Sequence, residues 1–226
     1  GVSNFLSMKP DTGSLIVRQS RLDPKSEVLA ELSITRTSGP RGGSTFSPLV
    51  LDAGLSSATM LMQGASMLFA HWAEGFQKHV NELPRFDQAL SNAMGGVPDI
   101  AYYHSYWALA EDEALVIDAT PPPCDHWNFQ LSNHWLESLD YRVHHIHLNT
   151  KTASVRPDGS VRIVVAHRDP GAPAALLPFN WLETAGHAFG AMCFRWVRPE
   201  VDPPPVPVTR VVKLDAEGRL LHSLGG

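Results

Sequence analysis

Residues 114–131 read ALVIDATPPPCDHWNFQL, and this stretch decides the class of fold. It opens with four apolar residues in a row, typical of a buried strand, and Thr120–Pro123 ends that run because proline cannot donate to a sheet ladder. Apolar side chains then alternate along 127–131 with the amides of Asn128 and Gln130, which indicates a strand with one buried and one polar face. The stretch therefore predicts two short strands separated by a proline-rich connection.

The same punctuation by proline and glycine continues toward the C-terminus. The apolar run 161–167 follows the turn signal RPDG at 156–159, and residues 191–197 form a further strand pattern. Many short strands with such turns are typical of all-β sandwiches. We therefore predict a mainly β chain, an antiparallel jelly-roll-like β-sandwich over residues 100–200 that carries a helical segment.

The N-terminal part of the chain changes its hydrophobic period. Residues 15–18 are a short apolar run and residues 28–35 alternate, which predicts strands. Between Gly54 and Val80 apolar side chains recur every three or four positions, which predicts the longest helix, with its apolar face packed in the core. The predicted organisation is a single domain, 1–226, with N-terminal strands in 1–50, a helical segment in 51–99, the sandwich in 100–200, and a proline-rich linker and terminal hairpin in 201–226.

Charge and composition argue against several classes of protein. The 226 residues contain 18 Lys and Arg against 23 Asp and Glu, a formal net charge of −5, whereas a nucleic-acid partner requires a basic face. The apolar runs are too short for a membrane span, and the first residues lack the pattern of a signal peptide. Cys124 and Cys193 lie far apart in apolar or proline-rich surroundings, which favours free thiols in a reducing, cytoplasmic compartment.

Histidines are frequent in this chain, which contains 11 of them. On a strand, His145 and His147 would project to one face, which is how a cupin-like metal site begins, and His167 or His187 could supply a third ligand. No carboxylate follows at Thr150–Lys151, where such a site would place its acid. We therefore predict no tightly bound metal and no cofactor, with histidines that line a polar groove or surface as the plainer interpretation.

A second set of candidates combines amides with a tryptophan. Amide, imidazole and indole groups together suit recognition of hydroxyls or carbonyls by hydrogen bonding and stacking. The alternative is that the amides hold loop backbones inside the sandwich. The predicted ligand-binding residues are Asn128, Gln130, Asn149, Asn180 and Trp181.

Acid–base chemistry has two candidates among the histidines, His167 and His187. His167 ends a strand pattern two residues before Asp169, so the pair could act as a general base with an orienting carboxylate. Asp169 precedes a proline, however, and the more frequent role for such an aspartate is an Asx turn. Both interpretations stay open from sequence.

Arg195 is the third candidate catalytic residue, as an anion or oxyanion partner. It alternates with Phe194 and Trp196 on a predicted strand, so its side chain faces away from their apolar side. An arginine on a sheet face either pairs with a carboxylate or binds an anionic group. We expect Arg195 to be structural and paired with Glu183 or Asp140, while Asn180 and Trp181, in a turn, shape a pocket rim.

Six segments of the C-terminal half resemble a known family. They are Trp127–Leu131, Glu137–Tyr141, Asp158–Ser160, Val164–Gly171, Asn180–His187 and Arg195–Trp196. Their order and content resemble the family catalogued as domain of unknown function 1214, over about residues 100–200. The resemblance implies a jelly-roll-like β-sandwich, which in longer relatives often follows another β-rich lobe, and it implies no established reaction. The segment Gly171–Phe179 is longer than the family pattern.

Two functions therefore remain open from sequence. The first is an enzyme, for instance a hydrolase, acting on a small organic or carbohydrate-like molecule in a groove of the sandwich. The second is a non-catalytic ligand-binding or oligomer-forming β module. Convergence of the polar candidates in one pocket favours the first, and their dispersal into separate turns favours the second.

Overall fold

The computed structural model describes residues 4–9, 15–39, 47–171 and 178–220. They divide into two units, Gly1–Gly42 and Gly43–Gly226. The elements of the second unit are α1 (Pro48–Phe76), the 3-10 turn η1 (Gln77–His79), α2 (Gln88–Ala93), β1 (Ile100–Ala108), β2 (Glu113–Ala119), β3 (His126–Leu131), β4 (His147–Asn149), β5 (Val161–Ala166), β6 (Asn180–Glu183), β7 (Phe189–Val197) and β8 (Val208–Lys213).

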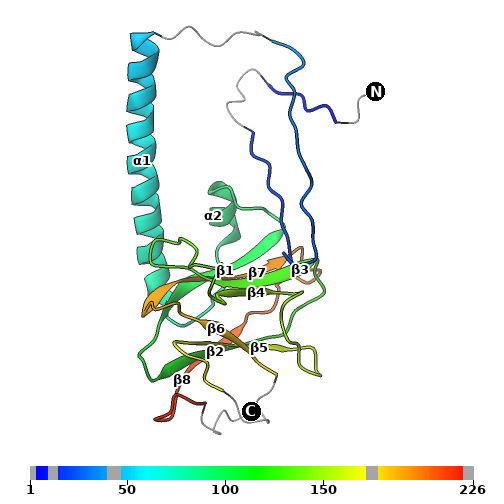
Figure 1. The fold of residues 1–226 in the computed structure, drawn as a ribbon, viewed down its shortest axis with the longest axis vertical. Coiled ribbons are helices and arrows are strands. Elements are labelled where there is room, and N and C mark those ends of the chain that lie inside the picture. The colour runs from blue at the N-terminus through cyan, green and yellow to red at the C-terminus, as the bar shows by residue number, and fades with distance from the viewer. Residues whose placement is uncertain (1–3, 10–14, 40–46, 172–177, 221–226) are drawn as a thin grey trace. The chain divides into compact units, whose positions relative to one another are not determined.

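The strands of the described residues form two four-stranded sheets that pack as a sandwich (Figure 1). The first sheet has the order β1-β7-β3-β4 and the second β6-β5-β2-β8. The predicted mainly β sandwich is confirmed, with two differences. β6 pairs with β5 in parallel, whereas every other pairing of named strands is antiparallel. β8, which the prediction placed beyond the sandwich, is an edge strand of the second sheet.

The core between the sheets consists of the alternating apolar residues that the sequence pattern indicates. Trp127, Phe129 and Leu131 of β3 are all buried, and the Trp127 ring stacks on Phe194 of β7 at 5.5 Å between centroids. Trp196 is also buried and donates its indole N–H to the Pro205 carbonyl at 2.9 Å. The proline-rich segment after β7 is thereby held against the first sheet.

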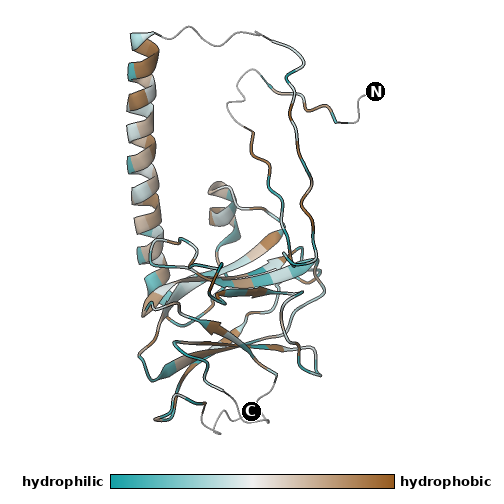
Figure 2. Cartoon of the chain, viewed as in Figure 1, coloured by the Kyte–Doolittle hydropathy of each residue, from teal (hydrophilic) through white to brown (hydrophobic). Residues whose placement is uncertain are grey.

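The predicted long helix is confirmed, but its apolar face is not core. α1 begins after Ser47, whose side chain accepts a hydrogen bond from the third helical residue, and proline occupies the first helical position. Of its 29 residues, Ala73 and Phe76 are buried, whereas Leu61 and Met67 are 72% and 74% exposed. Figure 2 shows hydrophobic positions along the length of α1. Side chains of the two sheets fill the core, so only the last turns of α1 are buried, and they pack on the outer face of the first sheet.

The first unit contains no strand within residues 15–39, although the pattern predicts strands at 15–18 and 28–35. Its two extended segments are linked by the Gln19 side chain, which donates to the Ala30 carbonyl at 3.0 Å and accepts from the Ala30 N–H at 2.8 Å. Val28 is almost fully exposed. An isolated pair of segments with no third strand to cover its apolar side is marginal as a sheet, which explains the difference.

Candidate functional site

The outer face of the first sheet carries two adjacent rows of side chains, mostly polar. The first row is Tyr102, Arg195, Asn128 and Asn149, in the strand order β1-β7-β3-β4. The second row, two residues along each strand, is His104, Cys193, Gln130 and His147. Residues two apart on a strand project to the same face. Four predicted site residues, Asn128, Gln130, Asn149 and Arg195, therefore share one face of one sheet.

A cavity of about 220 Å³ lies where the last turns of α1 and the α2 segment cover this face. α2 lies on the side of the first sheet that faces away from the second sheet (Figure 1). The lining residues are Trp72, Phe76, Phe86, Ser91, Met94, Gly95, Gly96, Tyr102, His104 and Arg195. We call this space the Arg195 cavity. Its walls come from α1, from the segment that follows η1, from α2 and from the strands β1 and β7.

Arg195 is held by amides rather than by a carboxylate. Its Nη1 donates to Asn128 Oδ1 at 3.0 Å and to Gln130 Oε1 at 3.1 Å. Its Cζ lies 5.8 Å from the centroid of the Tyr102 ring, within the range of a cation–π contact. Among the described residues, no carboxylate oxygen lies within 4.0 Å of the guanidinium. The positive charge of Arg195 is positioned but not neutralised.

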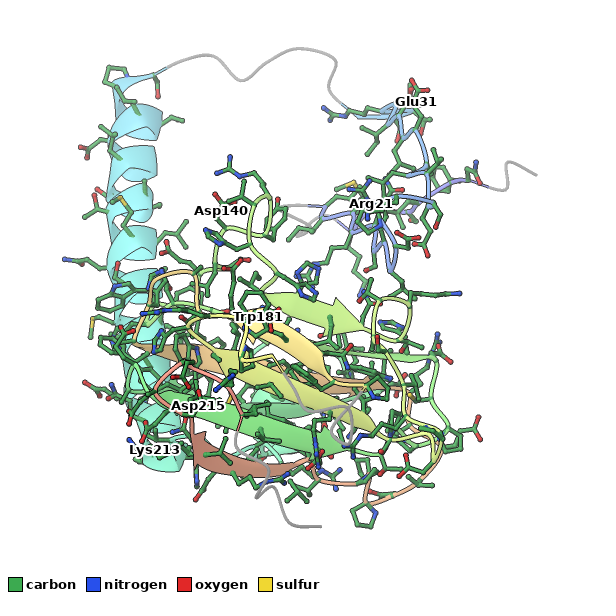
Figure 3. All side chains as sticks on the ribbon, turned by 60° about the horizontal axis from the view of Figure 1, so that its bottom comes forward. Arg21, Glu31, Asp140, Trp181, Lys213 and Asp215 are labelled. Carbon is green, nitrogen blue, oxygen red and sulfur yellow. The ribbon has the colours of Figure 1, made fainter. Side chains whose placement is uncertain are left out.

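The predicted ion pair of Arg195 with Glu183 or Asp140 is therefore wrong. Glu183 is in β6 of the second sheet, and its Oε1 contacts His144 Nδ1 at 2.8 Å. Asp140 lies in the loop before β4 (Figure 3) and accepts hydrogen bonds from Nε and Nη2 of Arg142, at 2.8 and 2.7 Å. Each carboxylate has a partner nearer in space than Arg195, a pairing that strand alternation does not reveal.

His104 lies among the aromatic rings that line the Arg195 cavity. Its ring stacks on Phe76 at 5.2 Å and on Tyr102 at 5.4 Å, with interplanar angles of 9° in both cases. Burial first, and then the charge of Arg195, lowers the pKa of His104 to about 4, so the imidazole is neutral at pH 7. Sequence reasoning did not single out His104, although it alternates with the buried residues 103 and 105 and so had to face outward.

The two cysteines are free, as predicted. Cys193 is buried beside the Arg195 cavity, with its Sγ 3.9 Å from Nε2 of His104. Burial raises the pKa of the Cys193 thiol, and burial likewise raises that of Cys124. Both therefore stay protonated at neutral pH and are weak nucleophiles.

Asn149 and the histidine pair do not build a site of their own. Asn149 Oδ1 accepts hydrogen bonds from the N–H groups of Lys151 and Thr152, so this amide holds the turn after β4. β4 begins at His147, and His145 lies before it, so the two rings are not on one strand as predicted. Within the described residues, no group of three or more His, Cys, Asp or Glu side chains is placed to hold a metal ion.

Neither His167 nor His187 lines the Arg195 cavity. His167 Nε2 lies 3.2 Å from the Leu109 carbonyl, which can only accept, so that nitrogen carries a proton. Its Nδ1 lies 2.8 Å from the Thr184 hydroxyl, so both ring nitrogens are engaged. His187 is exposed at the end of a turn closed by its N–H to the Thr184 carbonyl. Asp169 accepts from the Gly171 N–H at 3.0 Å, the Asx turn that was one of the two interpretations.

Asn180 and Trp181 belong to a strand of the second sheet, not to a turn at a pocket rim as predicted. Asn180 is buried and bonds the backbone of Ser154 through both ends of its amide, at 2.7 and 3.0 Å. Trp181 packs with Val164 and Ala166, and its indole N–H donates to the Ala166 carbonyl at 3.3 Å (Figure 3). Both residues stabilise the second sheet, and neither lines the Arg195 cavity.

Comparison with known proteins finds similarity to solved structures. No family model matches it, so the likeness to domain of unknown function 1214 stays a resemblance, and no curated protein matches either. A crystal structure of an uncharacterised protein from Burkholderia cenocepacia is 47% identical, with a TM-score of 0.77, over 85% of this chain and 51% of that one. The chain thus spans about half the length of that relative. The VPA0106 protein from Vibrio parahaemolyticus matches at 16% identity and a TM-score of 0.41, over 55% of this chain and 34% of that one.

Proposed function

We propose that this chain binds a small organic anion in the Arg195 cavity. The observation that supports the proposal is a guanidinium oriented by two amide oxygens and lacking a carboxylate partner among the described residues. Buried or half-buried charges are normally paired, so an arginine held in this way favours an anionic ligand as its missing partner. Asn128 and Gln130 occupy one guanidinium nitrogen, Nη1, which fixes the plane of the fork. They act as positioning residues.

Binding is favoured over catalysis in this proposal. The histidines predicted as acid–base groups, His167 and His187, are outside the cavity lining, so they are not placed to act on a molecule beside Arg195. Asn128 and Gln130 were predicted to bind the ligand, but they do not line the cavity and instead orient Arg195. The amides at 149 and 180 hold backbone. The predicted hydrolase accordingly receives no support from the geometry.

Replacing Arg195 with glutamine tests the proposal. Charge-assisted hydrogen bonds contribute about 1.5–3 kcal/mol, so we expect Arg195→Gln to weaken the binding of a carboxylate by roughly 10- to 150-fold. The measurement is isothermal titration calorimetry at pH 7 with benzoate, cyclohexanecarboxylate and methanesulfonate. The control is Arg142→Gln, which removes an exposed guanidinium from the same chain and should leave affinity unchanged. Equal affinity of Arg195→Gln and the unchanged protein, or no binding of any of the three anions, contradicts the proposal.

Self-association is a second candidate function, and α1 is the feature that favours it. Between Pro48 and Ala70, Asp52 is the only charged residue, and ten large apolar side chains of α1 are exposed. Monomers rarely leave such an apolar surface open. An uncharged apolar face is complementary to itself, so a second copy of the chain is the partner that we propose. No helix of the described residues is both long and apolar enough to cross a membrane.

Charge placed on α1 tests self-association. We expect the unchanged chain to sediment as a dimer or larger oligomer, and Leu61→Glu to shift it at least tenfold toward monomer, because a carboxylate would be buried in the apolar contact. Gln63→Glu adds the same charge at an exposed polar position of α1 and serves as the control. Analytical ultracentrifugation measures both variants. A monomeric unchanged chain at micromolar concentration rejects this second function.

A further inference from the structure

Five of the residues that line the Arg195 cavity carry aromatic rings, which bears on what the cavity would accept. Phe86 meets the Phe76 ring edge-on at 6.1 Å and the His104 ring at 5.2 Å, and Tyr102 stacks on the His104 ring at 5.4 Å. Trp72 of α1 adds a further aromatic wall. These rings are held by contacts with one another, so the chain itself positions this surface. Preassembled edge-to-face and stacked sites favour another ring over an aliphatic group.

The volume of the cavity suits a ligand of one ring. An apolar cavity of roughly 150 Å³ holds benzene. At about 220 Å³, the Arg195 cavity has room for one six-membered ring and one acid group. This volume is below the range of about 300–1,000 Å³ that is typical of sites for drug-sized ligands.

The charge of the cavity limits the ligand to one anionic group. Arg195 is the one lining residue of the described chain that is ionised at pH 7, because burial and Arg195 itself keep His104 neutral. The other polar side chains of the lining are uncharged: the hydroxyls of Ser91 and Tyr102 and the indole N–H of Trp72. The Tyr102 hydroxyl accepts from the Val97 N–H at 3.4 Å. A second carboxylate would therefore be buried among aromatic rings with no cation to pair with it.

We infer that the ligand is a carboxylate of a single aromatic ring, with its acid group on the Arg195 guanidinium and its ring against Phe86 and Tyr102. This inference rests on the proposed binding of an organic anion at the same site. The acid group takes the guanidinium nitrogens that the amides of Asn128 and Gln130 leave open, and the ring replaces water against the aromatic wall.

Titration of the full chain with four matched compounds tests the ligand class. We expect benzoate to bind about fivefold tighter than cyclohexanecarboxylate, which has the same charge and nearly the same size without the π-system. Benzamide lacks the charge and should bind at least tenfold more weakly than benzoate. Phthalate carries a second carboxylate and should bind at least tenfold more weakly as well. Isothermal titration calorimetry at pH 7 gives all four dissociation constants.

Two variants separate the ring contact from the charge contact. Phe86→Leu should reduce the preference for benzoate over cyclohexanecarboxylate to less than twofold, whereas Phe189→Leu, at an exposed ring of β7, should leave that preference intact. If cyclohexanecarboxylate binds the unchanged protein as tightly as benzoate, the aromatic class is wrong and anion binding stands. If methanesulfonate binds and neither carboxylate does, the inferred ligand class is wrong; if none of these three anions binds, the proposed function itself is wrong. Phthalate binding as tight as benzoate overturns the restriction to one acid group.

Discussion

Gly190→Ala is expected to destabilise the sandwich by about 3 kcal/mol. A Cβ at this position of β7 would lie 2.1 Å from the Ser132 carbonyl oxygen and 3.0 Å from Trp107 Nε1. The Ser132 oxygen is backbone at the end of β3, and the indole N–H of Trp107 donates to it at 3.4 Å. The added methyl group must therefore displace a strand end and leave a buried donor poorly bonded, and both effects are costly. Urea denaturation followed by tryptophan fluorescence measures the change.

Gly64→Ala is the matched control for this substitution. Gly64 lies in the interior of α1, and a Cβ built there meets no atom within 4 Å. Alanine in an exposed helix interior is favoured over glycine by about 0.5–1 kcal/mol, so this variant should gain stability. If Gly190→Ala unfolds at the same urea concentration as the unchanged chain, the close approach of β7 to the end of β3 is incorrect.

The polar face of the first sheet follows from strand period alone. Alternation along 127–131 places Asn128 and Gln130 opposite the buried tryptophan side, and alternation along β7 does the same for Arg195. What the sequence could not reveal is the register between β3 and β7, which joins residues about 65 positions apart and puts the amides within 3.1 Å of the guanidinium. The failed choice of Glu183 as a partner shows the same limit, because sheet membership is a long-range property.

The helix and the strand β6 show two other limits of local pattern. The apolar period of α1 predicts a helix with an apolar face, but it does not specify what covers that face. Asn180 and Trp181 follow a proline-rich stretch and so resemble a turn, yet parallel pairing with β5 makes them a strand. Alternation places His104 on the outer face of β1, but the rings that contact it come from α1 and from the segment between η1 and α2. No spacing in the sequence indicates that contact, so His104 was missed.

Asp118→Asn is expected to lower the free energy of unfolding by about 2–3 kcal/mol. Asp118 Oδ1 accepts from Arg162 Nε at 2.6 Å, and its Oδ2 accepts from Arg162 Nη2 at 2.9 Å and from Arg210 Nη1 at 2.8 Å. The Arg162 side chain is only 10% exposed, so neutralising its partner leaves a nearly buried charge uncompensated. The expected loss lies below the value of about 3–5 kcal/mol for a fully buried pair, because Asp118 is one quarter exposed and its charge is partly screened. Thermal and urea unfolding at pH 7 measure the loss.

The pH dependence of this difference identifies the carboxylate as its source. Burial alone would raise the pKa of Asp118, but hydrogen bonds and charge from Arg162 and Arg210 outweigh burial and hold that pKa below its usual 3.8. A carboxyl with a lowered pKa in the folded state contributes its stability in full above about pH 5 and loses it as pH falls through the lowered pKa. The gap between the unchanged chain and Asp118→Asn should therefore be constant from pH 5 to 8 and shrink below pH 4. Asp112→Asn, which removes an exposed pair with Lys213, should cost clearly less stability at pH 7 than Asp118→Asn. A gap for Asp118→Asn that is no larger than this control means that the Arg162–Asp118–Arg210 cluster does not hold β2, β5 and β8 together.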